Sequence, residues 1–125
     1  MDVSEYQRRT ADTAFVYQES IADGLGSSFD STKRSYLAMS YCTLGIAGEA
    51  GEIAEHIKKM LRDDRMIPTI ERRNALHAEI GDLLWYVSQL CTELGYSLDS
   101  VMENNLLKLE SRKLRGTLQG SGDDR

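Results

Sequence analysis

The segment from Thr69 to Leu94 reads TIERRNALHAEIGDLLWYVSQLCTEL and carries the most regular apolar pattern in the chain. Its apolar residues recur at steps of three and four, which places them along one face of a helix. They are Leu76, Ile80, Leu83, Val87, Leu90, Cys91 and Leu94. Thr69 can act as the N-cap of this helix, and Gly95 has the place and chemistry of a C-cap. The segment therefore predicts one long helix whose apolar stripe faces a core.

Three further helices are expected around this segment, and no run of residues has the alternating pattern of a strand. Their ranges are Asp2–Ile21, Ser35–Leu61 and Leu98–Leu114, with a loop at Gly24–Lys33 and a polar turn at Arg62–Thr69. The second of them carries a core face made of Met39, Cys42, Ile46, Ala50, Ile53, Ile57 and Met60. The last carries Val101, Met102, Leu106 and Leu109. The pattern predicts an all-α four-helix bundle over residues 1–115 and a flexible C-terminal tail over residues 116–125.

The composition limits the classes to which the chain can belong. Of its 125 residues, 41% are hydrophobic and 28% are charged, which suits one folded domain. The net charge of -5 argues against a nucleic-acid partner, which requires a basic face. The sequence has neither a run approaching the roughly 20 apolar residues of a membrane helix nor the apolar core of a signal peptide. Cys42 and Cys91 fit reduced core thiols, and we expect a cytoplasmic protein without a membrane partner.

Two similar segments place carboxylates beside core positions, EAGEI at 49–53 and EIGDL at 79–83. Two acids three residues apart lie on one face of a helix, about 4.5 Å apart along its axis. If the two helices pack antiparallel, four carboxylates can surround one small space, where their repulsion requires a cation or protonation. These acids are Glu49, Glu52, Glu79 and Asp82. Oxygen ligands without cysteine or a nearby histidine favour Mg²⁺ or Mn²⁺.

The alternative interpretation is that these acids belong to ordinary solvated helix faces, because one Glu-x-x-Glu pair is weak evidence for a metal. Three glycines in the first of the two helices favour a functional interpretation, since each costs about 1 kcal/mol relative to alanine. They are Gly45, Gly48 and Gly51. Their presence indicates a close approach of the backbone or room for a ligand.

The chain resembles the MazG-like nucleoside triphosphate pyrophosphohydrolases in GIAGEAGEIAEHIKK at 45–59, EIGDLLWYV at 79–87 and NNLLKLESR at 104–112. The family signature is Glu-x-x-Glu on one helix, Glu-x-x-Asp on the next, and a later Asn-x-x-Lys followed by a basic residue. The resemblance extends from about Tyr6 to Arg112. It implies an oligomeric all-α bundle in which Glu49, Glu52, Glu79 and Asp82 hold Mg²⁺. It also implies hydrolysis of a (deoxy)nucleoside triphosphate to the monophosphate and pyrophosphate, in house-cleaning of the nucleotide pool.

The triphosphate that the resemblance implies needs cations and a surface for its base. Lys59 lies seven residues after Glu52 on the same helix face and is expected to contact phosphate, unless it only occupies the solvated end of the helix. The resemblance assigns three more residues to the substrate, Asn105, Lys108 and Arg112, which would otherwise be a simple surface edge. Trp85 lies one turn from Asp82 and can stack a base, although a tryptophan on an apolar helix more often belongs to a core or an interface.

The expected nucleophile is a water molecule, because the sequence shows no Ser/His/Asp set, no Cys/His pair and no phosphate-binding loop. Glu52 is the expected general base, and Glu49 is the second choice. Neither His56 nor His77 has the Glu-x-x-His spacing of di-iron bundles, and both are expected to be exposed.

Two alternative functions stay open at this point. One is a pyrophosphatase of the same superfamily restricted to dUTP or dCTP, and the other is a non-catalytic helical module for regulation or interaction. Several apolar residues lie off the main stripes, namely Leu84, Trp85, Tyr86 and Leu107. One small bundle cannot cover all of them, so we expect a homodimer or homotetramer in which helices of two subunits pack together.

Overall fold

The computed structural model describes residues 1–123, and within this range the chain is helical and contains no β-strand. Its elements are α1 (Val3–Ala11), α2 (Phe15–Leu25), the 3-10 helix η1 (Gly26–Ser28), α3 (Ser31–Asp63), α4 (Ile70–Glu93) and α5 (Leu98–Leu114). The all-α class expected from the sequence is therefore confirmed. The expected tail includes residues 124–125, which lie outside the described residues.

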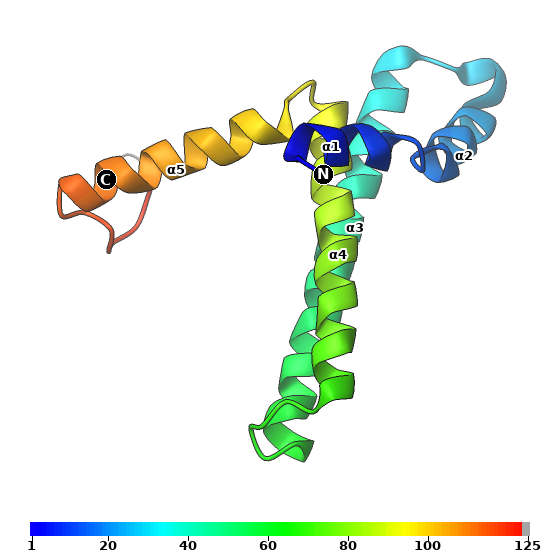
Figure 1. The fold of residues 1–125 in the computed structure, drawn as a ribbon. Helices are drawn as coiled ribbons and strands as arrows, with labels where there is room; N and C mark the ends of the chain where they lie inside the picture. The colour runs from blue at the N-terminus through cyan, green and yellow to red at the C-terminus, as the bar shows by residue number, and fades with distance from the viewer. Residues whose placement is uncertain (124–125) are drawn as a thin grey trace.

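Helices α3 and α4 lie side by side and form the long hairpin at the centre of Figure 1. The side chain of Asp30 accepts a hydrogen bond from the Lys33 amide, so α3 begins four residues before the expected start at Ser35. At the start of α4, the Thr69 hydroxyl accepts from the Arg72 amide at 3.2 Å, as the sequence predicts.

The end of α4 has the geometry of a Schellman motif. Gly95 has a φ angle of +75°, a left-handed conformation that glycine adopts without strain. The Tyr96 amide then donates to the Cys91 carbonyl at 2.8 Å. The C-cap expected at Gly95 is thus present, and it turns the chain from α4 toward α5.

Gly45 allows α3 and α4 to approach each other closely. A Cβ atom at this position would lie 2.2 Å from Cε1 of Tyr86, so the tyrosine ring occupies the space of the missing side chain. Gly48 and Gly51 have no such neighbour within 4 Å. The expectation of close backbone approach therefore holds at Gly45 alone among the three.

The single N-terminal helix expected over residues 2–21 is in fact two helices. Between them, the amides of Asp12, Thr13 and Ala14 each donate to the carbonyl three residues earlier, which tightens the turn. The Thr13 hydroxyl donates to the Thr10 carbonyl at 2.9 Å and competes with regular helix bonds. Ala14, at the end of this turn, and Tyr17 of α2 are both buried.

The core lies where α2 packs on the hairpin, and it is made of Ala14, Tyr17, Ala38 and Cys42. A polar network closes it: the Tyr17 hydroxyl donates to Glu93 at 2.6 Å, and Arg34 pairs with Glu93 at 2.9 Å. Both cysteines are buried free thiols, as expected. Burial raises the pKa of the Cys42 and Cys91 thiols.

The predicted apolar stripe of α4 is only partly covered within one chain. Cys91 is buried and Leu90 packs against the core, while Tyr86, which lies off the stripe, occupies the space beside Gly45 of α3. Two members of the predicted stripe, Ile80 and Leu94, are 48% and 46% exposed. On α3, Ala50 and Ile57 are also exposed. The pattern therefore predicted the helix correctly, but only part of its apolar stripe is covered within one chain.

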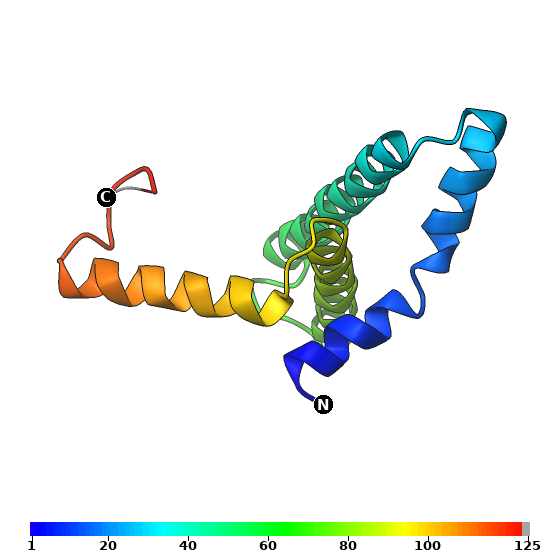
Figure 2. The same cartoon turned by 90° about the horizontal axis from the view of Figure 1, so that it is seen from above.

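Helix α5 runs away from the hairpin, as Figures 1 and 2 show from two directions. Its expected core residues are therefore exposed in the single chain: Val101, Met102, Leu106 and Leu109. The N-terminal end of α5 touches α1, where Gln7 accepts from the Leu98 amide at 2.8 Å. The described part of one chain is thus a hairpin with two short helices packed on one end and a projecting arm.

Candidate metal and nucleotide site

Three of the four predicted acids come together between α3 and α4. Glu49 of α3 and Glu79 and Asp82 of α4 each offer a carboxylate oxygen, and these oxygens lie within 4.8 Å of one another. Glu49 and Glu79 are partly buried and Asp82 is exposed. The antiparallel pairing expected from EAGEI and EIGDL therefore brings the two motifs face to face.

The carboxylates perturb one another. Partial burial, followed by the charges of Asp82 and Glu79, raises the pKa of Glu49 above its ordinary value of 4.5. Glu52 adds a smaller effect of the same sign. Repulsion of this kind favours binding of a proton or a cation in the space between the acids.

Glu52 is exposed and stands outside the three-residue group, one turn along α3 from Glu49. The site is therefore a cluster of three acids with a fourth beside it. The donor set fits a hard cation: it consists of carboxylate oxygens with room left for other ligands, which suits Mg²⁺ or Mn²⁺.

An aromatic cavity of about 380 Å³ opens next to these acids. It is lined by Thr13, Val16, Tyr41, Glu49, Asp82, Trp85 and Tyr86. The rings of Trp85 and Tyr86 meet edge to face with centroids 5.0 Å apart, and the Trp85 Nε1 donates to the Thr13 hydroxyl at 2.8 Å. The Trp85 ring thus packs against its neighbours and also lines the cavity, and its stacking on a base stays a prediction.

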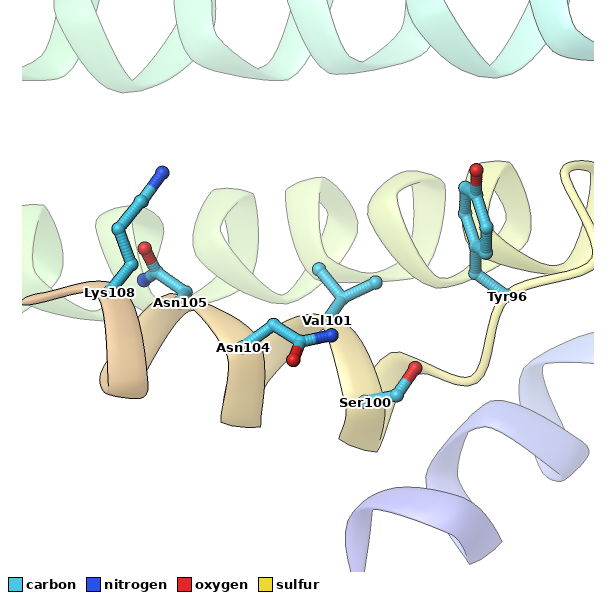
Figure 3. A pocket seen from close by; sticks show the side chains of 6 residues that line it. All are labelled: Tyr96, Ser100, Val101, Asn104, Asn105 and Lys108. Atoms are coloured by element: carbon cyan, nitrogen blue, oxygen red, sulfur yellow. The ribbon is translucent and has the colours of Figure 1, made fainter. Parts of the chain in front are cut away.

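The predicted phosphate-binding residues lie apart from the acids within one chain. Lys59 pairs with Glu55 on its own helix at 3.3 Å. Asn105 and Lys108 line a separate cavity of about 500 Å³ along α5, on the same side of that helix as Val101 (Figure 3). Helix α5 projects away from the hairpin that carries the acids (Figures 1 and 2), and none of the four acids lines the cavity of Asn105 and Lys108.

Arg112 is buried beneath the segment that follows α5. Its guanidinium donates to the Asp123 carboxylate at 3.1 Å and to the Asp123 carbonyl at 2.9 Å. Lys108 approaches the same carboxylate at 3.4 Å. Lys108 and Arg112, which the family resemblance assigns to the substrate, thus both contact the Asp123 carboxylate in this structure.

Comparison with known proteins gives the family. The MazG nucleotide pyrophosphohydrolase domain matches residues 39–115, a range that contains all four acids and all of α4 and α5. The chain belongs to the MazG family. The Gene 37 protein of Mycobacterium phage L5 is 47% identical over 125 residues, and the alignment covers the whole of both chains. No solved structure matches the chain.

Family membership confirms the recognised resemblance and supports nucleotide pyrophosphohydrolase activity in general. The MazG match begins at Met39, so α1 and α2 lie outside it, although Thr13 and Val16 at their junction line the aromatic cavity. In residues 1–123, no helix is both long and apolar enough to span a membrane.

Sequence reasoning missed one residue beside the MazG acids. His56 was expected to be exposed, yet its side chain is only 20% exposed and its Nε2 lies 3.5 Å from Glu79 Oε1. Its spacing gave a signal, because Glu49, Glu52 and His56 follow steps of three and four along one face of α3. His77 is exposed, as expected. Of the aromatic residues, Tyr41 lines the cavity and Tyr36 does not.

Proposed function

We propose that this MazG-family protein hydrolyses (deoxy)nucleoside triphosphates between the α- and β-phosphates, giving the monophosphate and pyrophosphate. The observation that carries the proposal is that the acid cluster adjoins the aromatic cavity. Glu49 and Asp82 belong both to the acid cluster and to the wall of the aromatic cavity. One ligand can therefore place a ring against aromatic side chains and a phosphate chain against the acids.

The aromatic wall suits the base of the nucleotide. Trp85 is held by its hydrogen bond to Thr13, so its ring is ordered before a ligand arrives. Base–aromatic stacking contributes about 1–3 kcal/mol and is tolerant of base identity. The cavity therefore supports binding of nucleotides in general rather than one particular base.

The acids suit the triphosphate only with a cation between them, and we propose Mg²⁺, with Mn²⁺ as a substitute, held by Glu49, Glu79 and Asp82 with Glu52 beside them. When bound, the cation neutralises phosphate charge and lowers the pKa of a coordinated water. Glu52 is our candidate for the general base that takes a proton from the attacking water. Its exposure and its place outside the group of three leave its carboxylate available for this role. Glu49 is the second candidate.

The leaving pyrophosphate needs positive charge, which Lys59 and α5 carry. We propose that α5 of a second copy of the chain brings Asn105, Lys108 and Arg112 to the acids of the first, in a homodimer or a dimer of dimers. The exposed apolar residues of α5 support this arrangement, because they need a partner surface. Such an enzyme needs neither nucleic acid nor membrane, and its reduced thiols suit the cytoplasm.

Product analysis in ¹⁸O-labelled water tests the proposal. The protein is incubated with each deoxynucleoside triphosphate and Mg²⁺, and the expected products are the monophosphate carrying the label and unlabelled pyrophosphate. EDTA and the Glu79→Gln variant should both abolish turnover, and the variant should keep wild-type helicity. Label in free orthophosphate, accumulation of a diphosphate, or full activity in EDTA would contradict the proposed reaction.

A further inference from the structure

Between the acid cluster and the turn that joins α3 to α4, four side chains touch in series. His56 of α3 lies against Glu79 of α4, with His56 Nε2 3.5 Å from Glu79 Oε1. Arg72 of α4 lies on the other side of the same ring, with its Nη1 3.5 Å from His56 Nδ1. Asp64, at the C-terminal end of α3, pairs with Arg72. The chain of contacts leads from the turn to one of the three clustered carboxylates.

The protonation pattern of the ring follows from its partners. A guanidinium has only donors, so the His56 Nδ1 beside Arg72 must be the acceptor of that contact. The ring proton is then on Nε2, the nitrogen that faces the Glu79 carboxylate. A proton on Nδ1 would point at the N–H groups of Arg72. The arrangement therefore selects the tautomer that can donate to Glu79.

Arg72 is itself fixed. Its Nε and Nη2 donate to the two carboxylate oxygens of Asp64 at 2.8 Å and 3.3 Å, which is a two-point contact. The two side chains are 18% and 11% exposed, so solvent competes little for this pair. Because Asp64 caps α3 and Arg72 lies in the first turns of α4, the pair also fixes the axial position of α4 relative to α3.

We propose that His56, held by Arg72, is a positioning residue that sets the orientation of the Glu79 carboxylate for a divalent cation. The terminal torsion of a glutamate side chain has broad minima, so a carboxylate without a partner samples many orientations. A donor at one oxygen restricts that rotation and directs the group toward Glu49 and Asp82. Partners of ligating groups typically change metal affinity by 10–100-fold when they are removed. The inference rests on the proposed function, since it requires a cation at the acid cluster.

Mn²⁺ binding to the full chain tests the role of His56 without any measurement of turnover. Free Mn²⁺ is followed by electron paramagnetic resonance during titration of the wild type, His56→Ala, His56→Gln and the control His77→Ala. Removing the donor in His56→Ala should weaken Mn²⁺ binding about tenfold. His56→Gln places an N–H near the lost Nε2 and should recover most of the affinity. His77 is exposed on α4, and its variant should bind Mn²⁺ like the wild type.

The tautomer is a second, independent readout. The chain has 2 histidines, so a long-range ¹H–¹⁵N spectrum of the imidazole rings contains only two patterns. The pattern that His56→Ala removes should be that of the Nε2–H tautomer, and Arg72→Met should change it. A dominant Nδ1–H tautomer at His56 would overturn the inference whatever the metal affinity.

The outcomes separate this inference from the proposed function. If the wild type binds no Mn²⁺, both fail together. If the wild type binds Mn²⁺ and His56→Ala binds it equally well, or if His56→Gln is as weak as His56→Ala, the positioning role alone is wrong. Circular dichroism melts without metal identify a variant that has lost its fold, and Arg72→Met then supplies the test through the same titration, with weaker Mn²⁺ binding expected.

Discussion

Neutralising Glu49 should stabilise the protein when no cation is present. The clustered oxygens lie within 4.8 Å of one another, and two unit charges at that distance repel by about 0.9 kcal/mol in water. Glu49→Gln removes two such pairs, those with Glu79 and Asp82. Salt at 0.15 M, with a Debye length of about 8 Å, leaves roughly half of this energy. The expected gain is therefore about 1 kcal/mol.

For a chain of 125 residues, about 1 kcal/mol corresponds to a rise of about 4 °C in the melting midpoint. The assay is a thermal melt in EDTA, followed by circular dichroism at neutral pH. Glu19→Gln is the matched control, because it removes one negative charge from an exposed position on α2 outside the cluster. The control should leave the midpoint close to that of the wild type. A Glu49→Gln midpoint equal to or below that of the control would refute the assigned repulsion.

The same comparison has a defined pH dependence. Because the pKa of Glu49 is raised in the folded state, the metal-free wild type loses stability as the pH rises from the ordinary value of 4.5 through the raised pKa. Below that range the carboxyl is protonated in both states and the two proteins should differ little. The advantage of Glu49→Gln should then grow with pH and level off. With Mn²⁺ added at neutral pH, the wild type should gain more stability than the variant.

Three further predictions concern packing, assembly and the base. Gly51→Ala should raise the melting midpoint by about 4 °C, because alanine favours the helix and its methyl group would enter open space. Gly45→Ala should lower the midpoint, because its methyl group would collide with Tyr86, and similar midpoints for the two variants would contradict this packing. Glu79→Gln and Lys108→Ala should each be inactive alone. If each site combines acids and α5 from different subunits, mixing the two proteins should restore about a quarter of wild-type turnover, and if each chain is self-sufficient, mixing should restore none. Trp85→Ala should raise the KM for a deoxynucleoside triphosphate about tenfold while inhibition by inorganic tripolyphosphate, which has no base, stays unchanged; equal losses for both would remove the stacking role.

Much of the fold follows from local patterns. The last three helices lie within a few residues of the ends expected from the apolar stripes and from the caps at Thr69 and Gly95. The break at Asp12–Ala14 was missed because the helical spacing of the apolar residues continues through it. The turn bonds themselves are local, but the Thr13 hydroxyl also accepts a hydrogen bond from Trp85, 72 positions later, and that partner cannot be inferred from the local pattern.

The candidate site could be predicted only in part, because some of its residues depend on contacts between distant segments. The spacing of EAGEI and EIGDL predicted which acids share a helix face, and three of them meet. Their distance from Lys108 and Arg112 depends on the direction of α5, which the stripe on that helix does not specify. The position of His56 beside Glu79 likewise depends on the axial position of α4 relative to α3, which the Asp64–Arg72 pair fixes across the turn.

The packing between α3 and α4 varies along the length of their hairpin. All of its buried residues lie near one end, namely Ala38, Cys42, Ser88, Gln89 and Cys91, and no residue between Thr43 and Val87 is buried. The acids lie in that less buried stretch, where their charges push the helices apart. Backbone amides should therefore exchange with solvent in a gradient, slowest beside Tyr17 and fastest toward the turn. A cation held by the acids would link the two helices in the middle of the weakly packed stretch, so that cation binding and the local separation of the helices become one coupled equilibrium.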